Sequence, residues 1–193
     1  MGRCKYISRT GLVVPWVTVC YVSMIMKEEL YEIFKALNDA DVRYIVAGGL
    51  AVIAHGYIRL TSDVDLIIDL ERENLLAGLK ALETVGYVPR LPVSGEQFCD
   101  PDLRKFWIQE KNMLVFPLWK PSEANGLIVD VFVDYPFEFS AELANAKWMD
   151  TETGARIPFV GLDLLMQMKQ NAARPKDLED LRRLRAIEED DDE

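Results

Sequence analysis

The sequence is poor in the residues that build zinc sites and disulfide frameworks. Its 193 residues include one histidine, His55, and three cysteines, Cys4, Cys20 and Cys99, which lie far apart in the chain. An odd number of widely spaced cysteines indicates neither a disulfide framework nor a cysteine-based zinc site. We therefore expect a protein of the reducing cytoplasm.

Basic residues are scarce relative to acidic ones. The 22 Lys and Arg residues against 32 Asp and Glu residues give a formal net charge of −10. Because binding to nucleic acid depends on neutralising phosphates with Lys and Arg, this balance argues against a broad, non-specific nucleic-acid surface. It leaves room for a local basic patch. Hydrophobic residues make up 50% of the chain, which suffices for a core, and the length fits one compact domain or a domain with a small helical extension.

The chain has one extended apolar run, residues 12–26, which is short for a transmembrane helix. Basic residues precede it as in a signal peptide, but two glutamates follow it in place of a small-residue cleavage site. Residues 1–25 therefore have two interpretations, an over-extended start, which we favour, or a weak membrane anchor. We expect no stable membrane association, a domain over 26–187, and a disordered acidic tail at 188–193.

Two aspartates at the start of an apolar, β-branched run form the most informative pattern. Asp63 and Asp65 open a predicted strand over 64–69. Residues i and i+2 of a strand point to the same face, with Cα atoms roughly 7 Å apart. Two carboxylates at the start of a buried strand are costly unless something pairs them, and a divalent cation would relieve their mutual repulsion.

A glycine pair precedes the two aspartates. Gly48-Gly49 lies between a predicted strand, 42–47, and a predicted short apolar helix, 50–56. Such a turn lets backbone N–H groups approach phosphate oxygens closely. The competing interpretation is an ordinary tight turn that uses glycine for a positive φ.

A third aspartate, Asp130, interrupts the apolar run 127–133, which also reads as a strand. Aspartate is depleted in strand interiors, so its presence needs a reason. One interpretation is a structural carboxylate bonded to neighbouring backbone. The other is the third ligand of a metal site formed with Asp63 and Asp65.

The glycine pair, the Asp63-Val64-Asp65 motif and the later lone Asp130 together resemble the nucleotidyltransferase superfamily related to DNA polymerase β. Small prokaryotic members, including the AbiEii-type toxin nucleotidyltransferases, share further short motifs with residues 28–187. These are His55-Gly56, Arg59-Leu60-Thr61, Lys169 and Arg174-Pro175-Lys176-Asp177. The resemblance implies an α/β (α+β) fold, with a mixed sheet flanked by helices and with helices at the C-terminus.

The resemblance also implies an activity, the Mg²⁺-dependent transfer of a nucleoside monophosphate from a nucleoside triphosphate to an acceptor. Two Mg²⁺ ions, or Mn²⁺ in their place, would be bound by Asp63, Asp65 and Asp130. By the same resemblance Asp130 would help to deprotonate the acceptor, and Gly48 and Gly49 would hold the triphosphate.

Three further residues are candidates for nucleotide binding, each with a structural alternative. Arg59 either reaches a phosphate or braces the acidic turn, and Thr61 either contacts substrate or caps that turn. Lys169 either reaches the triphosphate or is a solvated residue of an amphipathic helix. His55 is a catalytic candidate or simply ends the first short helix.

Other charged and aromatic residues have simpler explanations. The basic residues of 174–185 alternate with acids, so helical i,i+4 pairing explains most of them. Trp107 and Trp119 either stack on a base or belong to a core or interface.

The acceptor remains open among tRNA, a protein hydroxyl and a small antibiotic-like molecule. A toxin with a cognate antitoxin is one biological setting. The alternative to an enzyme is a non-catalytic nucleotide- or partner-binding protein on the same fold, which the presence of all three aspartates disfavours. A purely structural metal-binding domain leaves the glycine pair unexplained.

The remaining pattern predicts an alternation of helices and strands. We expect helices at 27–40, 71–85, 100–110, 137–145, 161–172 and 176–187, and strands at 113–119, 147–150 and 155–160.

Overall fold

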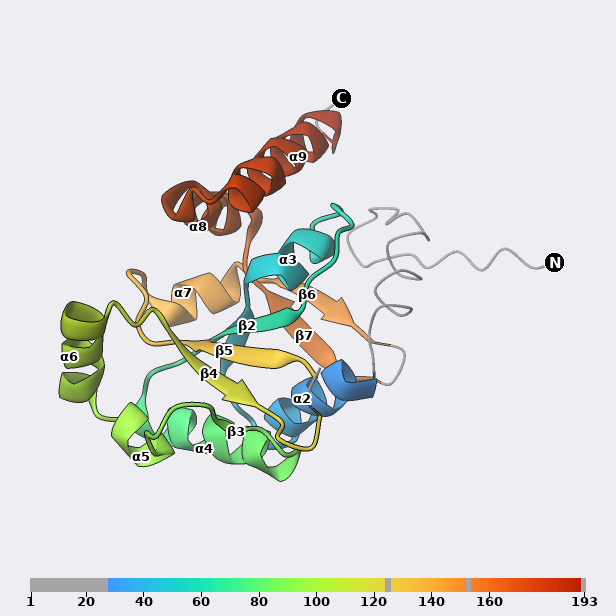
Figure 1. The fold of residues 1–193 in the computed structure, drawn as a ribbon. Coiled ribbons are helices and arrows are strands. Elements are labelled where there is room, and N and C mark those ends of the chain that lie inside the picture. The colour runs from blue at the N-terminus through green and yellow to red at the C-terminus, as the bar shows by residue number, and fades with distance from the viewer. Residues whose placement is uncertain (1–27, 124–125, 152–153, 192–193) are drawn as a thin grey trace.

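The computed structural model describes residues 28–123, 126–151 and 154–191, and the expected N-terminal extension, 1–25, lies outside them. A seven-stranded mixed sheet in the order β3-β4-β5-β2-β1-β7-β6 forms its centre (Figure 1). The strands are β1 (Tyr44–Val46), β2 (Asp63–Ile68), β3 (Val88–Pro89), β4 (Val115–Trp119), β5 (Ile128–Phe132), β6 (Lys147–Asp150) and β7 (Arg156–Phe159). The predicted mixed α/β class is confirmed.

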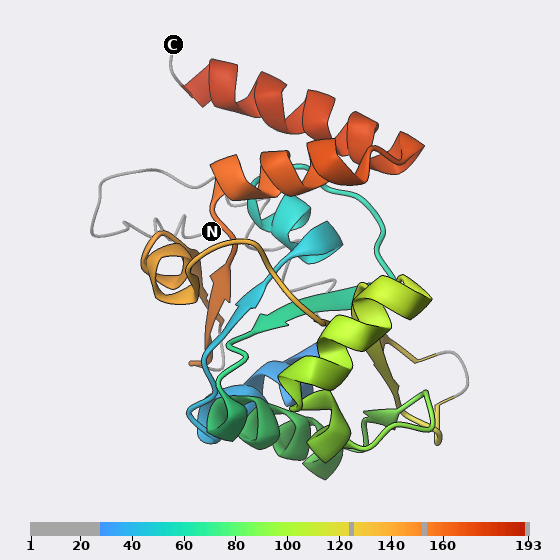
Figure 2. The ribbon, with the colours of Figure 1, turned by 90° about the vertical axis from the view of Figure 1, so that its left-hand side faces the viewer.

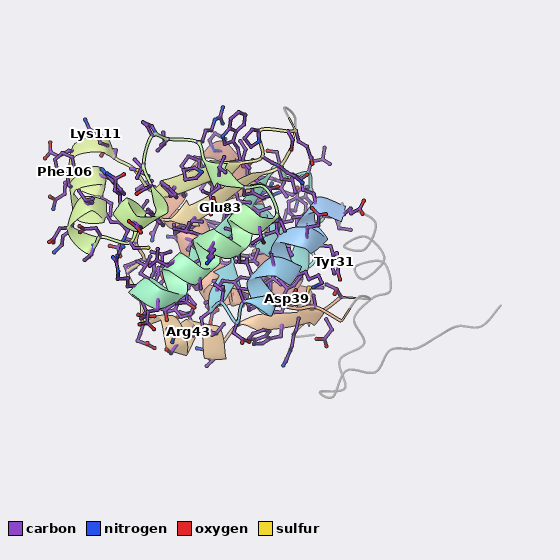
Figure 3. The ribbon with its side chains drawn as sticks, turned by 90° about the horizontal axis from the view of Figure 1, so that it is seen from below. Tyr31, Asp39, Arg43, Glu83, Phe106 and Lys111 are labelled. Carbon is purple, nitrogen blue, oxygen red and sulfur yellow. The ribbon has the colours of Figure 1, made fainter. Side chains whose placement is uncertain are left out.

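Helices flank this sheet, and the last two of them form the C-terminal end of the described chain. They are α2 (Glu28–Asp39), α3 (Gly48–Ala54), α4 (Arg72–Thr84), α5 (Gly95–Phe98), α6 (Pro101–Lys111), α7 (Phe139–Ala144), α8 (Leu162–Ala172) and α9 (Pro175–Asp191). Seen from below, α2 and α4 lie side by side across one face of the sheet (Figure 3). The helices α3, α8 and α9 are stacked on the opposite side (Figure 2).

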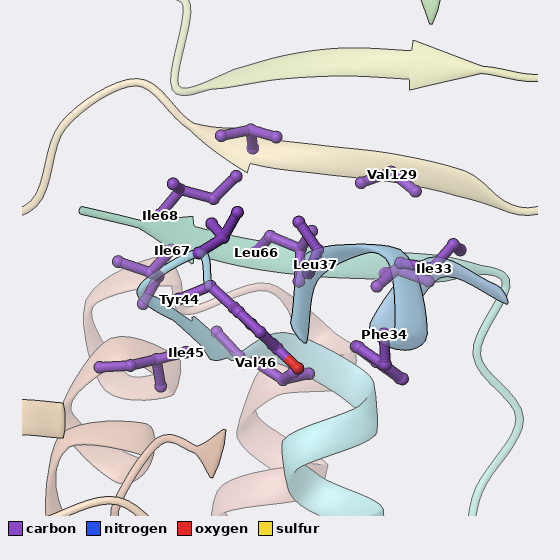
Figure 4. Packing of buried hydrophobic residues seen from close by; sticks show 14 of the residues in the cluster. Ile33, Phe34, Leu37, Tyr44, Ile45, Val46, Leu66, Ile67, Ile68 and Val129 are labelled. Atoms are coloured by element: carbon purple, nitrogen blue, oxygen red, sulfur yellow. The ribbon is translucent and has the colours of Figure 1, made fainter. Parts of the chain in front are cut away.

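The core forms where α2 and α4 cover the central strands. The apolar stripe of α2 buries Ile33 and Leu37 completely. These side chains pack toward Leu66 and Val129 of the two central strands (Figure 4). Strand alternation thus divides β2 and β5 into one apolar face for the core and one face free for polar groups.

Local sequence signals mark the starts of α4 and α6. The Glu71 side chain accepts hydrogen bonds from the backbone N–H groups of Glu73 and Asn74 at the start of α4. Asp100 caps α6 in the same way, with proline at the first helical position. Carboxylates at these positions satisfy backbone donors that a helix leaves unpaired, so the two helices begin within a residue or so of their predicted starts.

The structure differs from the sequence-based expectation at three places. Gly48 and Gly49 are the first residues of α3 rather than a separate turn before it. The segment 87–99, without a clear pattern, forms β3 and the short helix α5. Helix α9 continues through Asp191, into the expected disordered tail, because no helix-breaking residue follows Ile187.

No helix within the described ranges is long and apolar enough to cross a membrane.

Candidate active site

The three aspartates singled out by the sequence lie on one face of the sheet. Strands β2 and β5 are parallel neighbours, and their register sets Asp65 beside Asp130 and Asp63 beside Ile128. Paired residues of neighbouring strands point to the same face, and Asp63 and Asp65 share a face because they are two positions apart. The structure therefore brings all three carboxylates together on the face opposite the apolar core.

Burial and the repulsion of neighbouring carboxylates disfavour the ionised forms of Asp65 and Asp130. Burial raises the pKa of Asp65, and the charge of Asp63 raises it further. The pKa of Asp130 is raised to about 6, first by burial and then by the charges of Asp65 and Asp63. The ionised forms of Asp65 and Asp130 are thus destabilised, and positive charge beside them would be favourable.

Positive side chains from the C-terminal helices already act on the acidic pair. Lys169 of α8 and Lys176 of α9 both lower the pKa of Asp65, as does a hydrogen bond from the backbone N–H of Gly49. Two of the carboxylates are held locally, Asp65 by that N–H group and Asp63 by the hydroxyl of Ser62. The site therefore faces α8 and α9 across α3 (Figure 2).

The carboxylates are not yet in a metal-binding arrangement. Within the described part of the chain, no group of three His, Cys, Asp or Glu side chains is placed to hold one ion. Joint coordination by Asp63, Asp65 and Asp130 consequently requires side-chain rotations from the conformations shown. The donor set itself suits Mg²⁺, since it offers only carboxylate oxygens on adjacent strands.

The glycine pair has a structural role that involves Asp65. Gly48 has φ +61°, and a Cβ added there would lie 1.7 Å from Oδ2 of Asp65. A Cβ added to Gly49 would lie 2.4 Å from Oγ1 of Thr61. The first turn of α3 therefore fits directly against the acidic strand and the loop before it, and only glycine permits that contact.

Replacing Gly48 by alanine is expected to displace Asp65. The left-handed backbone alone costs roughly 1–2 kcal/mol for alanine. The clash with the carboxylate adds to this, and a displacement of about 1 Å at a reacting group can cost on the order of a hundredfold in rate. We expect Gly48→Ala to lose most of the nucleotidyl transfer that the sequence resemblance implies, measured with a labelled nucleoside triphosphate, together with some stability.

Gly154→Ala is the matched control for that substitution. Gly154 also has a positive φ, +85°, but an added Cβ there meets nothing within 4 Å. The Gly154→Ala variant should lose only the stability that the left-handed backbone costs alanine, and it should keep full activity. Equal activity losses in the two variants would show that the Gly48 contact with Asp65 is unimportant.

Arg59 and Lys169 are both held by Asp180 of α9. Nε of Arg59 lies 2.8 Å from Oδ1 of Asp180, and Nζ of Lys169 lies 2.9 Å from Oδ2 of the same residue. Lys169 also lies 2.9 Å from Oδ1 of Asp177 and is only 5% exposed. Lys169 is therefore not a solvated helix residue, and Arg59 braces the loop before β2 against α9.

The remaining candidates lie close to the site or beside it. Oγ1 of Thr61 donates to the backbone carbonyl of Asp63, 3.5 Å away, so Thr61 supports the acidic turn. His55 ends α3, and its Nε2 lies 2.8 Å from the carbonyl oxygen of Val160. Burial lowers the pKa of His55, which keeps the ring neutral and fits its structural interpretation.

Sequence reasoning missed the importance of Asp177 and Asp180. Their side chains are 0% and 1% exposed, and they neutralise Lys169 from the interior of the α8–α9 pair. In the sequence they look like ordinary partners of neighbouring basic residues. The sequence did contain one indication of their role. Asp177 and Asp180 are three positions apart, which places both carboxylates on one face of a helix.

Comparisons with known proteins support the fold. No family model and no curated protein matches the chain, but several solved structures do. The lincosamide antibiotic adenylyltransferase LnuA, in a lincomycin-bound structure, matches with a TM-score of 0.53 and 16% identity, over 84% of this chain and 98% of that one. TM1012 from Thermotoga maritima, a proposed nucleotidyltransferase, matches with a TM-score of 0.51 and 17% identity, over 84% and 91%.

A third match is the solution structure of the antibiotic-resistance factor ANT(2'')-Ia, with a TM-score of 0.50 and 14% identity over 81% of this chain and 80% of that one. At such identities the likeness concerns the fold. The chain has the nucleotidyltransferase fold, which confirms at the level of structure the resemblance seen in its motifs.

Proposed function

We propose that the protein transfers a nucleoside monophosphate from a nucleoside triphosphate to an acceptor hydroxyl. The parallel pairing of β2 with β5 carries this proposal, since it sets Asp65 beside Asp130 with Asp63 on the same face. The first turn of α3 lies against this group, with the N–H of Gly49 directed at a carboxylate oxygen. A structural role alone does not account for three mutually repelling carboxylates on one sheet face.

Each residue then has a role in the transfer. Asp63, Asp65 and Asp130 would hold Mg²⁺, which supplies charge neutralisation for the triphosphate and lowers the pKa of the acceptor hydroxyl. Asp130 accepts the proton of that hydroxyl as its oxygen forms a bond to the α-phosphorus. The bond from the α-phosphorus to the bridging oxygen breaks, and pyrophosphate leaves.

The glycine turn and the basic residues would serve the triphosphate. Gly48 and Gly49 leave the backbone accessible, because neither carries a side chain. The charge of Lys176 lowers the pKa of Asp65. The pKa of Arg174 is raised first by its hydrogen bond to Asp177 and further by the charges of Asp65 and Asp63. Arg59, Thr61 and Lys169 act in this scheme by positioning the loop and helices around the nucleotide.

The acceptor is a separate part of the proposal. LnuA is an antibiotic adenylyltransferase whose structure holds lincomycin, and this favours a small molecule over tRNA or a protein hydroxyl. The toxin setting, with a cognate antitoxin, rests on the short motifs alone. A non-catalytic binding protein on this fold has no need of the three aspartates.

Incubation with each labelled nucleoside triphosphate tests the proposal. The mixtures contain Mg²⁺ and either cellular RNA, cellular protein or a small-molecule extract, with and without a chelator. We expect chelator-sensitive transfer of label to one fraction. Tight metal-dependent nucleotide binding with no transfer to any fraction would favour the non-catalytic alternative.

The raised pKa of Asp130 predicts a pH-dependent penalty on stability. An acid whose pKa is higher in the folded than in the unfolded protein binds more protons when folded, so stability falls as pH rises through that interval. For Asp130 the interval runs from its ordinary value near 3.8 to about 6. Asp130→Asn removes this penalty.

Denaturant unfolding at pH 4 and pH 7 measures the effect. The stability gained by Asp130→Asn over the wild type, without divalent ions, should be larger at pH 7 than at pH 4. A gain that is equal at the two pH values would contradict the burial and repulsion assigned to this carboxylate.

A further inference from the structure

A row of residues crosses four strands and ends at the acidic site. The backbone N–H of Arg90, just after β3, donates to the carbonyl of Pro117 on β4 at 2.9 Å. Pro117 is paired with Asp130 on β5, and Asp130 with Asp65 on β2. Directly paired residues share a sheet face, so Arg90 and Pro117 continue the face that carries the carboxylates.

A second row runs beside the first and is apolar. Trp119 lies two positions after Pro117 on β4 and is paired with Val88 of β3. It therefore shares the face of Pro117, and 37% of its surface is exposed. Val88 and Pro117 are partly exposed as well. An accessible apolar surface thus extends from the carboxylates toward the β3 edge of the sheet.

Arg90 is an exposed cation at this surface. Its pairing with Pro117, which is itself paired with Asp130, places Arg90 on the sheet face of the carboxylates. Within the described ranges the hydrogen bond shown for Arg90 is that of its backbone N–H to Pro117, and no carboxylate lies within ion-pair distance of its guanidinium. By contrast, Arg59, Arg174 and Arg183 all have carboxylate partners.

The three carboxylates of Asp63, Asp65 and Asp130 have different elements on their two sides along the sheet. Strand β1 and the glycine turn lie on one side of β2, whereas β5, β4 and β3 follow in order on the other. Arg90 follows β3 and lies, through Pro117, in the same row across the sheet as Asp130. Since Asp130 is the proposed base, the acceptor approaches from the β4–β3 side.

We infer that the acceptor is a phosphorylated molecule with a flat ring, whose phosphate meets Arg90 while its ring lies on Trp119. This inference rests on the proposed transfer and adds the acceptor class to it. A guanidinium group matches the geometry of phosphate oxygens and forms paired hydrogen bonds with them. A partly exposed tryptophan presents a flat surface on which an aromatic ring or base stacks.

The same surface disfavours a polycationic aminosugar acceptor. Such a molecule would place its ammonium groups near Arg90, and like charges at short distance repel. A nucleotide-like acceptor combines the three required parts, a hydroxyl for Asp130, a phosphate for Arg90 and a ring for Trp119.

A binding experiment separates this inference from catalysis. The nucleotide site is first filled with a non-hydrolysable nucleoside triphosphate and Mg²⁺. Calorimetry then measures binding of a ribodinucleotide with a 5′-phosphate and of the same dinucleotide without it. The proteins are the wild type, Arg90→Gln, Arg90→Lys and Trp119→Ala, with Lys80→Gln on the exposed side of α4 as the control for lost positive charge.

The wild type should bind the phosphorylated dinucleotide about tenfold more tightly, the effect of one charge-assisted contact. Arg90→Gln should abolish that preference, Arg90→Lys should keep part of it, and Lys80→Gln should keep all of it. Trp119→Ala should weaken both probes, by about tenfold if one stacking contact is lost.

Two results would overturn the inference. One is equal binding of the two dinucleotides by the wild type, and the other is a phosphate preference that survives in Arg90→Gln. Either leaves the proposed transfer untouched. A phosphate preference that depends on Arg90, in a protein that transfers nothing, supports the acceptor surface and counts against the proposed function instead.

Discussion

Replacing Asp63 and Asp65 together by asparagine is expected to abolish nucleotidyl transfer without unfolding the protein. Transfer should fall by about a thousandfold or more, because the ions proposed to bind there would stabilise charge that develops only in the transition state. Metal-dependent binding of the triphosphate should be lost as well. The assays are label transfer and calorimetry of Mg²⁺–ATP and Mg²⁺–GTP.

The stability of this double variant should equal or exceed that of the wild type. The folded structure raises the pKa of Asp65 through burial and the charge of Asp63, so its ionised form opposes folding at neutral pH. Neutral side chains of the same size remove that cost. Denaturant unfolding without divalent ions measures it.

Asp69→Asn is the matched control for the change of aspartate to asparagine, because Asp69 directly follows β2 at the end opposite to Asp63. Asp69 pairs with Arg43 at 2.8 Å and has no part in the proposed site. It should keep full transfer while gaining no stability. Unchanged transfer and nucleotide binding in the Asp63 and Asp65 double variant would remove these residues from the proposed mechanism.

Asp180→Asn is expected to have the largest effect on stability. The Asp180 side chain is 1% exposed and neutralises both Arg59 and Lys169, whose side chains are 19% and 6% exposed. Lys169 keeps Asp177 as a partner, but Arg59 loses its carboxylate partner, and leaving one charge of a largely buried ion pair uncompensated costs about 3–5 kcal/mol. We therefore expect a lower free energy of unfolding by this order, measured with urea.

Glu179→Gln tests whether burial is the cause. Glu179 is the preceding residue, its side chain is 38% exposed, and it pairs with Arg182 and Arg183. Exposed pairs of this kind contribute about 0–1 kcal/mol. If the two variants differ little in their unfolding free energies, the buried network does not hold α9 against the loop before β2.

The central strands were predictable because local pattern and tertiary role agree there. Strand β2 combines β-branched residues with two acids spaced by two, and β5 shows one acid among valines. The alternation rule then predicts which face each side chain occupies. The adjacency of Asp65 and Asp130 was not determined by that rule, since it depends on the parallel register of two strands far apart in the chain.

The role of the glycine pair was only partly predictable. Glycine at a strand–helix junction indicated close backbone approach, and the sequence favoured a phosphate as the approaching group. In the structure the group against Gly48 is the carboxylate of Asp65. That contact joins residues on different elements, so no local pattern contains it.

The C-terminal helices show the same limit. Their basic residues alternate with acids, which local pairing explains for Arg183 and Glu179. Asp177 and Asp180 obey the same spacing, yet they are buried and pair with Lys169 on another helix. Charge spacing alone does not separate a solvated pair from a buried one, because burial is set by the packing of α8 on α9.

A crystal structure with Mn²⁺ and a non-hydrolysable nucleoside triphosphate tests the central claim most directly. Manganese gives an anomalous signal that locates the ion independently of the protein atoms. We predict manganese bound by rotated carboxylates of Asp63, Asp65 and Asp130, with the triphosphate beside Gly48 and Gly49. Manganese and triphosphate bound elsewhere, with the three carboxylates unligated, would contradict the assignment of this sheet face as the active site.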